Sequence, residues 1–305
     1  MAFTFNENSK LYLSSVLVSI CLSAPIYAQE NWVKSSEPDL AEFILIGERH
    51  GVEQQQLMTA VLLDQLSDSG RKVGVIMEMI STDQAKLVET FRKMSPKSNK
   101  DFGYAIGWHK TSWPDYSNYA PMFDVIWLRE MALAAGDPPA KAQSRWRKGD
   151  FNSVDYNPTK ALTKMYNPQK AKSVQASWEA SMQKAHCDQL GPEELSDVAR
   201  LQMMRDAFMA SQMRAMKAAG ADVVVLIAGR AHVRRDRGVP LYLGPNADVQ
   251  IFAIIEADPN EKEGETYQPE QKVEGVKPYD IIVLTDALPP KESSCDQLRR
   301  KGLIK

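Results

Sequence analysis

The sequence has few cysteines, few histidines and no excess of one charge. Its 305 residues contain 3 Cys and 4 His, and 37 Lys and Arg stand against 39 Asp and Glu, for a formal net charge of −2. Three cysteines are too few for a small disulfide-rich scaffold, and the balanced charge gives no electrostatic reason to expect a nucleic-acid partner. With 44% hydrophobic and 25% charged residues, the composition is typical of globular domains rather than of disordered or collagen-like chains.

Long hydrophobic runs are also lacking. The apolar stretch 11–24 follows Lys10 and is too short to span a bilayer, which needs about 20 residues. With small Ala28 after it, the stretch is typical of a secretory signal peptide over residues 1–28. A lipoprotein signal cleaved before Cys21 stays open as an alternative, although bulky Ile20 stands where such signals prefer a small residue. We therefore predict an exported protein, periplasmic or membrane-anchored as a lipoprotein.

Cleavage after Ala28 would leave two cysteines, Cys187 and Cys295. Exported proteins fold in an oxidising environment, where two remaining cysteines are more often bonded than free. We predict a disulfide that connects the C-terminal tail to the middle of the chain.

Short β-branched segments indicate the fold class. Five of them have the nearly continuous apolar character of buried parallel strands. Amphipathic helical patterns cover residues 53–69 and 200–219. Alternation of strand and helix predicts an α/β fold, with a mostly parallel sheet flanked by helices. The five segments are residues 43–47, 73–79, 223–229, 249–256 and 279–285.

The middle of the chain shows no convincing strand between residues 82 and 199. It consists of helical stretches rich in Ala, Lys and Met. We interpret residues 101–199 as a smaller all-helical inserted domain that divides an α/β domain formed by residues 29–100 and 200–305. The polar segment 257–278 is predicted to be an exposed loop.

Two predicted strands end in the same motif, a glycine followed three residues later by a histidine. The motifs are Gly47-Glu48-Arg49-His50 and Gly229-Arg230-Ala231-His232. In an open parallel sheet, ligands bind beyond the carboxyl ends of the strands. There, Glu78 and the first motif's glutamate would lie with both histidines, a set able to bind a metal, transfer protons or anchor a polar ligand. The sequence contains no G-x-S-x-G motif, which disfavours a serine α/β-hydrolase.

These motifs resemble those of the ChaN-like haem-binding uptake proteins, within the wider Tiki, TraB and EreA-like superfamily. The G-E-x-H motif ending at His50 is similar to the family's opening motif, and the strand containing Glu78 is similar to its strand ending in Glu-Met. The most specific stretch is 224–240, in which Arg237 stands where many relatives carry tyrosine. Further matching blocks are Trp113-Pro114 with Tyr116, Tyr119 and Pro121, then His186-Cys187, and residues 205–210.

The resemblance implies an exported protein of iron or haem uptake that is more a binding protein than an enzyme. Its ligand would be ferric haem (ferric protoporphyrin), held through a tyrosine at the interface of a homodimer, with an outer-membrane haem receptor as a further partner. A phenolate suits ferric iron. The leading candidate ligands are Tyr116 and Tyr119, in the matching segment, and the next are Tyr104, Tyr156 and Tyr166.

Polar groups are expected near the haem propionates. His109 stands beside Trp108, and Arg234 follows the second G-x-x-H motif in an arginine-rich run. Arginine binds carboxylates bidentately. The predicted polar residues of the haem site are His50, His232, Glu48, Glu78, His109 and Arg234.

A second hypothesis stays open, a metal-dependent hydrolase. In that case the two G-x-x-H histidines and Glu48 or Glu78 would bind a metal ion or activate water. Metal content and hydrolytic activity would distinguish this hypothesis from haem binding.

Overall fold

The computed structural model describes residues 41–94, 99–147, 150, 157–257, 272–287 and 293–304. The predicted signal peptide, Cys21, Tyr156 and most of the predicted loop 257–278 lie outside these residues.

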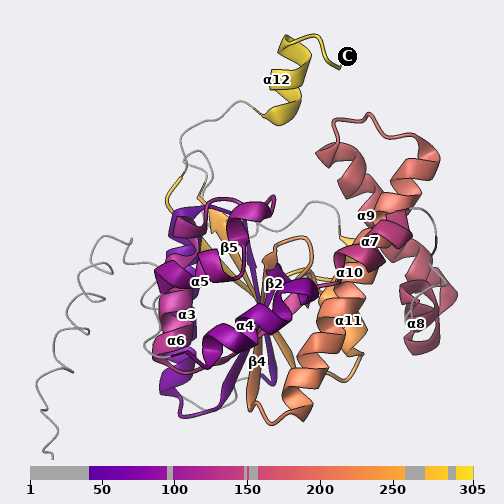
Figure 1. Cartoon of the computed structure of the whole chain (residues 1–305). Helices are drawn as coiled ribbons and strands as arrows, with labels where there is room; N and C mark the ends of the chain where they lie inside the picture. The colour runs from indigo at the N-terminus through magenta and orange to yellow at the C-terminus, as the bar shows by residue number, and fades with distance from the viewer. Residues whose placement is uncertain are drawn as a thin grey trace, which may run out of the picture.

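The fold is built on a parallel sheet of six strands in the order β3-β2-β4-β1-β5-β6 (Figure 1). Strands β1, β2 and β4 are buried over nearly their whole length, as parallel strands covered on both faces must be. The five predicted strands and the α/β fold class are confirmed. The strands are β1 (Phe43–Glu48), β2 (Val73–Ser81), β3 (Ala132–Asp137), β4 (Val223–Gly229), β5 (Val249–Glu256) and β6 (Ile281–Thr285).

Strand β3 corrects the expectation that residues 82–199 contain no strand. Its sequence, ALAAGD, has no β-branched or aromatic residue and so carries no strand signal. Small residues are needed there, because a Cβ at Gly136 would lie 2.7 Å from the carbonyl oxygen of Met77 on β2. The predicted boundaries 101 and 199 therefore enclose one strand of the sheet, and the division into two domains stays a prediction.

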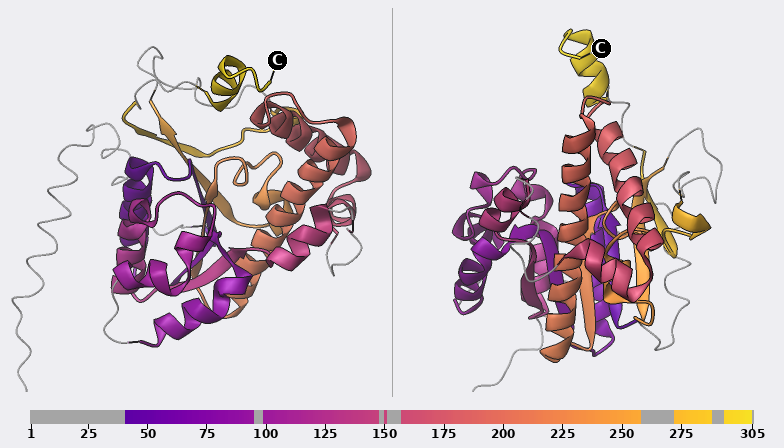
Figure 2. Two further views of the ribbon diagram at one scale, coloured as in Figure 1. Left: turned by 45° about the horizontal axis from the view of Figure 1, so that its top comes forward. Right: turned by 90° about the vertical axis from the view of Figure 1, so that its right-hand side faces the viewer.

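Helices cover both faces of the sheet (Figure 2). Alternate strand residues point to opposite faces, so Val75 packs with one set of helices and Ile76 with the other. The first face carries α3 (Glu53–Asp68), α4 (Ala85–Arg92), α5 (Asn99–Ala105) and α6 (Ala120–Leu128). The second carries α8 (Pro158–Met165), α9 (Pro168–Ala185), α10 (Pro192–Ala218) and α11 (Val239–Leu243).

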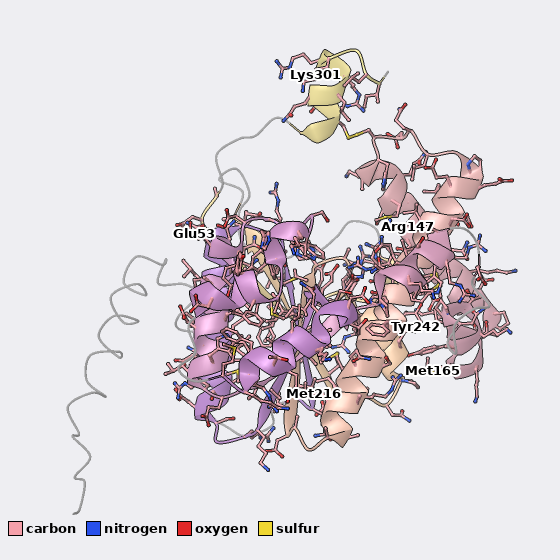
Figure 3. All side chains as sticks on the ribbon, in the orientation of Figure 1. Glu53, Arg147, Met165, Met216, Tyr242 and Lys301 are labelled. Carbon is pink, nitrogen blue, oxygen red and sulfur yellow. A yellow bond between two sulfur atoms is a disulfide. The ribbon has the colours of Figure 1, made fainter. Side chains whose placement is uncertain are left out.

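Two predicted helices correspond to α3 and α10. Helix α10 begins at Pro192, eight residues before the start that its apolar pattern predicts. Proline is tolerated in the first turn of a helix, because the N–H group that it lacks would have no partner within the helix there. In Figure 3, Glu53 at the start of α3 and Met216 near the end of α10 mark opposite ends of the sheet. No helix in the described part of the chain is long and apolar enough to cross a membrane.

The predicted disulfide is present between Cys187 and Cys295. It connects the turn between α9 and α10 to the C-terminal helix α12 (Ser294–Arg300), which stands apart from the sheet in Figure 1. Among the described elements, none packs extensively against α12. The disulfide is therefore the main attachment of this helix to the rest of the described structure.

Replacing both cysteines by serine should release the tail with a modest loss of stability. A bond that closes a loop of 108 residues stabilises a fold by roughly 4–5 kcal/mol when the native ends are held in place anyway. Here the tail would also gain freedom in the folded state, so we expect a smaller loss in thermal unfolding and release of the C-terminal peptide by limited trypsin under non-reducing conditions. A loss of the full amount, with the tail still protected, would contradict this account.

Candidate functional site

Five titratable side chains form one continuous row of contacts at the carboxyl ends of the strands. Glu48 ends β1, Glu78 lies near the end of β2, His50 and His232 follow β1 and β4, and Asp206 comes from α10. Their order in space is Glu48–His50–Glu78–His232–Asp206. We call this row the strand-end relay.

The two histidines contact their neighbours in the same way. His50 Nδ1 donates to Glu48 Oε1 at 2.5 Å, and His232 Nδ1 donates to Asp206 Oδ1 at 2.6 Å. Both Nε2 atoms face Glu78, at 3.5 Å from its Oε2 and Oε1 respectively. Each imidazole is thus oriented by an outer carboxylate and turned toward the central one.

Further polar groups hold Glu78 in place. Its Oε2 accepts the backbone N–H of Gly229 at 2.7 Å, and its Oε1 lies 2.8 Å from Arg205 Nη2. The Nε of Arg205 donates to Asp137, at the end of β3, at 2.9 Å. A buried charge is tolerated only with such partners. The site therefore links four neighbouring strands, β1 to β4, and α10.

Gln56 completes the site on the other side. Its Nε2 donates to Glu48 Oε2 at 2.7 Å from the first turns of α3. Both the glutamine and the glutamate are buried. Helix α3 thus secures the outer carboxylate that orients His50.

The relay shifts the pKa values of its members in different directions. Burial lowers the pKa of His50, but the charges of Glu78 and Glu48 outweigh it and raise this pKa to about 9. Burial alone would raise the pKa of Glu78, but the positive charges around it hold that pKa far below its usual range. Burial raises the pKa of Asp206 to about 6 against the attraction of His232. At neutral pH His50 is therefore an imidazolium beside a carboxylate.

Both G-x-x-H motifs have a glycine at a position where another part of the chain lies very close to the backbone. A Cβ at Gly229 would lie 3.1 Å from His50 Nε2, and a Cβ at Gly47 would lie 2.4 Å from Val233 Cγ2. A Cβ at Gly47 would also lie 3.0 Å from the Arg230 Cα of the second motif, and a Cβ at Gly229 would be tighter against His50 than an ordinary contact. Each G-x-x-H motif thus needs its glycine because the other motif packs against it.

The relay is open at one end and closed at the other. His50 exposes 27% of its side chain, and Trp113 packs edge-on against its ring at 4.8 Å between centroids. His232 exposes only 7%, and Trp178 covers its ring at 5.0 Å. A ligand can reach His50 without a change in the fold, whereas His232 lies behind it.

Of the eight residues predicted for the site, His50, His232, Glu48 and Glu78 are brought together in the relay. Tyr119 lies beside the relay, and Tyr116, His109 and Arg234 are not members of it. Tyr119 is fully buried close to the relay, and Tyr116 stacks on Phe123 at 5.4 Å. Burial raises the pKa of both phenols. His109 is exposed, and Arg234 is buried in a bidentate pair with Asp236 at 2.8 and 2.7 Å. The Arg234 guanidinium thus already forms a bidentate ion pair with a carboxylate.

Sequence reasoning missed Asp206, Arg205, Asp137 and Gln56. The first two belong to a block that resembles the family, but their roles depend on α10 crossing the sheet beside β2 and β4. Only the close packing of helix on sheet shows this. The charged Arg205-Asp206 pair, with Met203-Met204 before it and Ala207-Phe208 after it, is the signal that could have identified the first two.

Arg237 stands at the position where the family resemblance led us to expect a tyrosine. It is buried, with its guanidinium carbon 4.4 Å from the centre of the Trp178 ring, and it donates to the Ser177 carbonyl at 2.8 Å. Burial and the nearby charge of Arg234 lower its pKa to about 10. Arg237 therefore supports the same tryptophan that covers His232.

The metal-dependent alternative finds no ligand set in the part of the chain that the structure describes. No three His, Cys, Asp or Glu side chains there are placed to hold a metal ion. The relay nitrogens instead face carboxylates at hydrogen-bond or near hydrogen-bond distance.

Fold and site together define a parallel α/β protein with a histidine–carboxylate site beyond its strand ends. The family model described as haem-binding uptake, Tiki superfamily, ChaN matches residues 37–243, and the chain belongs to this family. No curated protein matches the chain.

One solved structure shares the fold, and two others are similar at lower TM-scores. The chain is 19% identical to a structure described as cofacial heme binding to ChaN of Campylobacter jejuni, with a TM-score of 0.56 over 70% of this chain and 82% of that one. A succinoglycan biosynthesis protein is 10% identical, with a TM-score of 0.41 over 83% and 76%. The type III effector HopBA1 is 10% identical, with a TM-score of 0.40 over 81% and 88%.

Proposed function

We propose that this protein binds ferric haem as its cargo in iron or haem uptake, with the phenolate of Tyr104 as the iron ligand. Membership of the haem-binding uptake family supports the cargo. The exposed phenol of Tyr104 is the observation that carries the ligand assignment.

Tyr104 differs from every other tyrosine in the described ranges. It exposes 79% of its surface on α5, whereas Tyr119 exposes none and Tyr116 packs among aromatic rings. An iron ligand has to be a phenolate that porphyrin can approach. Burial raises the pKa of Tyr116 and Tyr119, with Glu48 adding to the effect at Tyr119. Tyr104 has access to haem and lacks this burial.

The surroundings of Tyr104 fit a porphyrin. The His109 ring stacks on its ring at 5.3 Å and 15°, and Lys110 follows on the surface. Helix α4 packs against α5 and exposes 45% of Leu87, and Met94, two residues after the end of α4, exposes 55%. Apolar side chains suit the porphyrin faces, and the cationic Lys110 suits the propionates.

A haem on this face would leave its second side exposed. Exposed apolar residues of this kind are typical of contact surfaces, and the relative from Campylobacter jejuni is described as binding haem cofacially. We therefore propose that two copies of the chain enclose their haems between the α4–α5 faces, as a homodimer.

We further propose that the protein works after export and passes haem from or to an outer-membrane receptor. The Cys187–Cys295 disulfide supports export, because such bonds persist in oxidising compartments.

The experiment is a titration of the purified chain with hemin, followed by absorbance and by analytical ultracentrifugation. We expect a saturable Soret change with the charge-transfer band of a tyrosinate–iron complex, and a shift from monomer to dimer as haem binds. A linear, unsaturable signal at micromolar hemin would overturn the proposal. Saturation without dimer formation would overturn its interface alone.

A further inference from the structure

Charge is distributed unevenly between two groups of helices. Helices α7 (Ala140–Arg147), α8 and α9 carry three, two and three basic residues, and Glu179 is their one acidic residue. Helices α3 to α6, which cover the first face of the sheet, carry three basic and six acidic residues. Since the whole chain has a net charge of −2, the excess of positive charge on α7, α8 and α9 is local.

Most of this positive charge is available to an outside partner. Arg145 pairs with Asp150 at 2.8 Å, and buried Lys170 pairs with Glu274 at 3.2 Å. The other six basic side chains of these helices are exposed and form no ion pair with a carboxylate in the part of the chain that the structure describes. We call these six residues the basic helix face: Lys141, Arg147, Lys160, Lys164, Lys172 and Lys184.

The basic helix face belongs to one side of the molecule. Helices α7, α8 and α9 all pack against α10, and in Figure 1 they lie together on the side away from α3 and α6. The right-hand view of Figure 2 looks onto this side. In Figure 3, Arg147 at the end of α7 and Met165 at the end of α8 mark it.

The C-terminal helix adds to the same end of α9. The disulfide from Cys187 brings α12 to the residues that follow α9. Beyond α12, Lys301 is exposed and Leu303 exposes 67% of its surface. A cation and an apolar side chain are therefore exposed beside the basic helix face.

We propose that the basic helix face binds the headgroups of an anionic phospholipid bilayer. Basic residues close to an anionic membrane are attracted to it, and their contributions to binding accumulate. Five of the six residues are lysines, which are flexible point charges and need no fixed bidentate partner. Such side chains suit a fluid layer of phosphate groups.

Nucleic acid is a poorer match for this face. Trp146 and Trp178, the aromatic residues of α7 and α9, are buried, and α8 has no aromatic residue. These helices therefore expose no ring on which bases could stack. The preference for lipid also rests on the proposed export, because the disulfide favours an oxidising compartment.

The two sides of the molecule would have separate ligands. Tyr104 lies on α5, in the group of helices that cover the other face of the sheet and carry more acidic than basic residues. Those helices would be repelled from an anionic surface, so a bound molecule would direct the Tyr104 face away from it. Binding to lipid does not depend on haem binding.

The test is co-sedimentation of the full chain, without hemin, with vesicles of phosphatidylcholine alone or mixed with phosphatidylglycerol. We expect binding to the mixed vesicles only. Lys164→Gln with Lys172→Gln should weaken it by roughly 25-fold, at about fivefold for each lysine near the surface. Lys72→Gln with Lys86→Gln removes the same charge from exposed positions outside α7, α8 and α9 and should match the wild type. Thermal unfolding should be the same for both double variants.

Three results would contradict the proposal. Equal binding to both kinds of vesicle would exclude recognition of charge, and equal losses in the two double variants would exclude the basic helix face. Tighter binding to a DNA duplex than to the mixed vesicles would overturn the assignment to lipid. Salt at about 1 M, where screening acts beyond about 3 Å, should release the bound protein. A failed hemin titration would leave all these results unaffected.

Discussion

Replacing Tyr104 by phenylalanine should lower hemin affinity by roughly 100-fold or more, beyond the 10–100-fold that loss of a supporting residue costs at a metal site. The substitution removes only the oxygen of an exposed side chain, so the fold should be unaffected. The ring can still stack on His109, and residual binding should therefore be apolar and lack the charge-transfer band. Absorbance titration measures both the affinity and the spectrum.

Tyr166→Phe is the matched control. Its hydroxyl donates to the Leu241 carbonyl at 3.2 Å, on the other face of the sheet, so this variant should bind hemin as the wild type does. If Tyr104→Phe kept the wild-type spectrum while Tyr119→Phe lost it, the ligand would lie in the core, and the α4–α5 face would not be the haem site.

The β-branched strands could be predicted because a short, continuously apolar segment is itself the sequence signal of a strand that is buried on both faces. Strand β3 could not, since its alanines have low strand propensity and its glycine stands where a Cβ would meet the Met77 backbone of β2. A residue that is small because a neighbour is close carries no local signal. The same argument applies to Gly229, whose role depends on a histidine that lies far away in the sequence.

Four of the eight predicted site residues meet in the structure, because both G-x-x-H motifs follow parallel strands that end at the same edge of the sheet. The strand-end rule thus predicts the meeting of His50, Glu78 and His232. Asp206 lies on a helix, and no strand-end rule applies to it. Its contact with His232 depends on how α10 crosses the sheet.

The sequence could not rank the candidate ligand tyrosines by their exposure, for a different reason. Tyr116 and Tyr119 match a family segment, but a motif gives no measure of exposure. Their aromatic neighbours Trp108 and Phe123 come together in the packed core, whereas Tyr104 faces outward from α5. Access, which decides whether iron can bind, is a property of the folded chain.

Glu78→Ala should be the most destabilising single substitution at the relay. Glu78 is fully buried, contacts Arg205, His50 and His232, and accepts the Gly229 N–H. Removing one partner of a buried charge pair costs about 3–5 kcal/mol, and total stabilities are about 5–15 kcal/mol. We expect a large fall in the urea midpoint, measured with the disulfide intact.

Glu78→Gln keeps the size of the side chain and one carbonyl oxygen. This variant should fold, with a urea midpoint between those of the wild type and Glu78→Ala. Because the amide removes the charge that most raises the His50 pKa, that pKa should fall, and NMR titration of the ring can detect it. Glu89→Ala, on the exposed side of α4 beside Arg92 and Lys93, should leave the midpoint unchanged. If Glu78→Ala were no worse than Glu89→Ala, the relay would not be a charge-balanced unit, and the raised pKa of His50 would need another source.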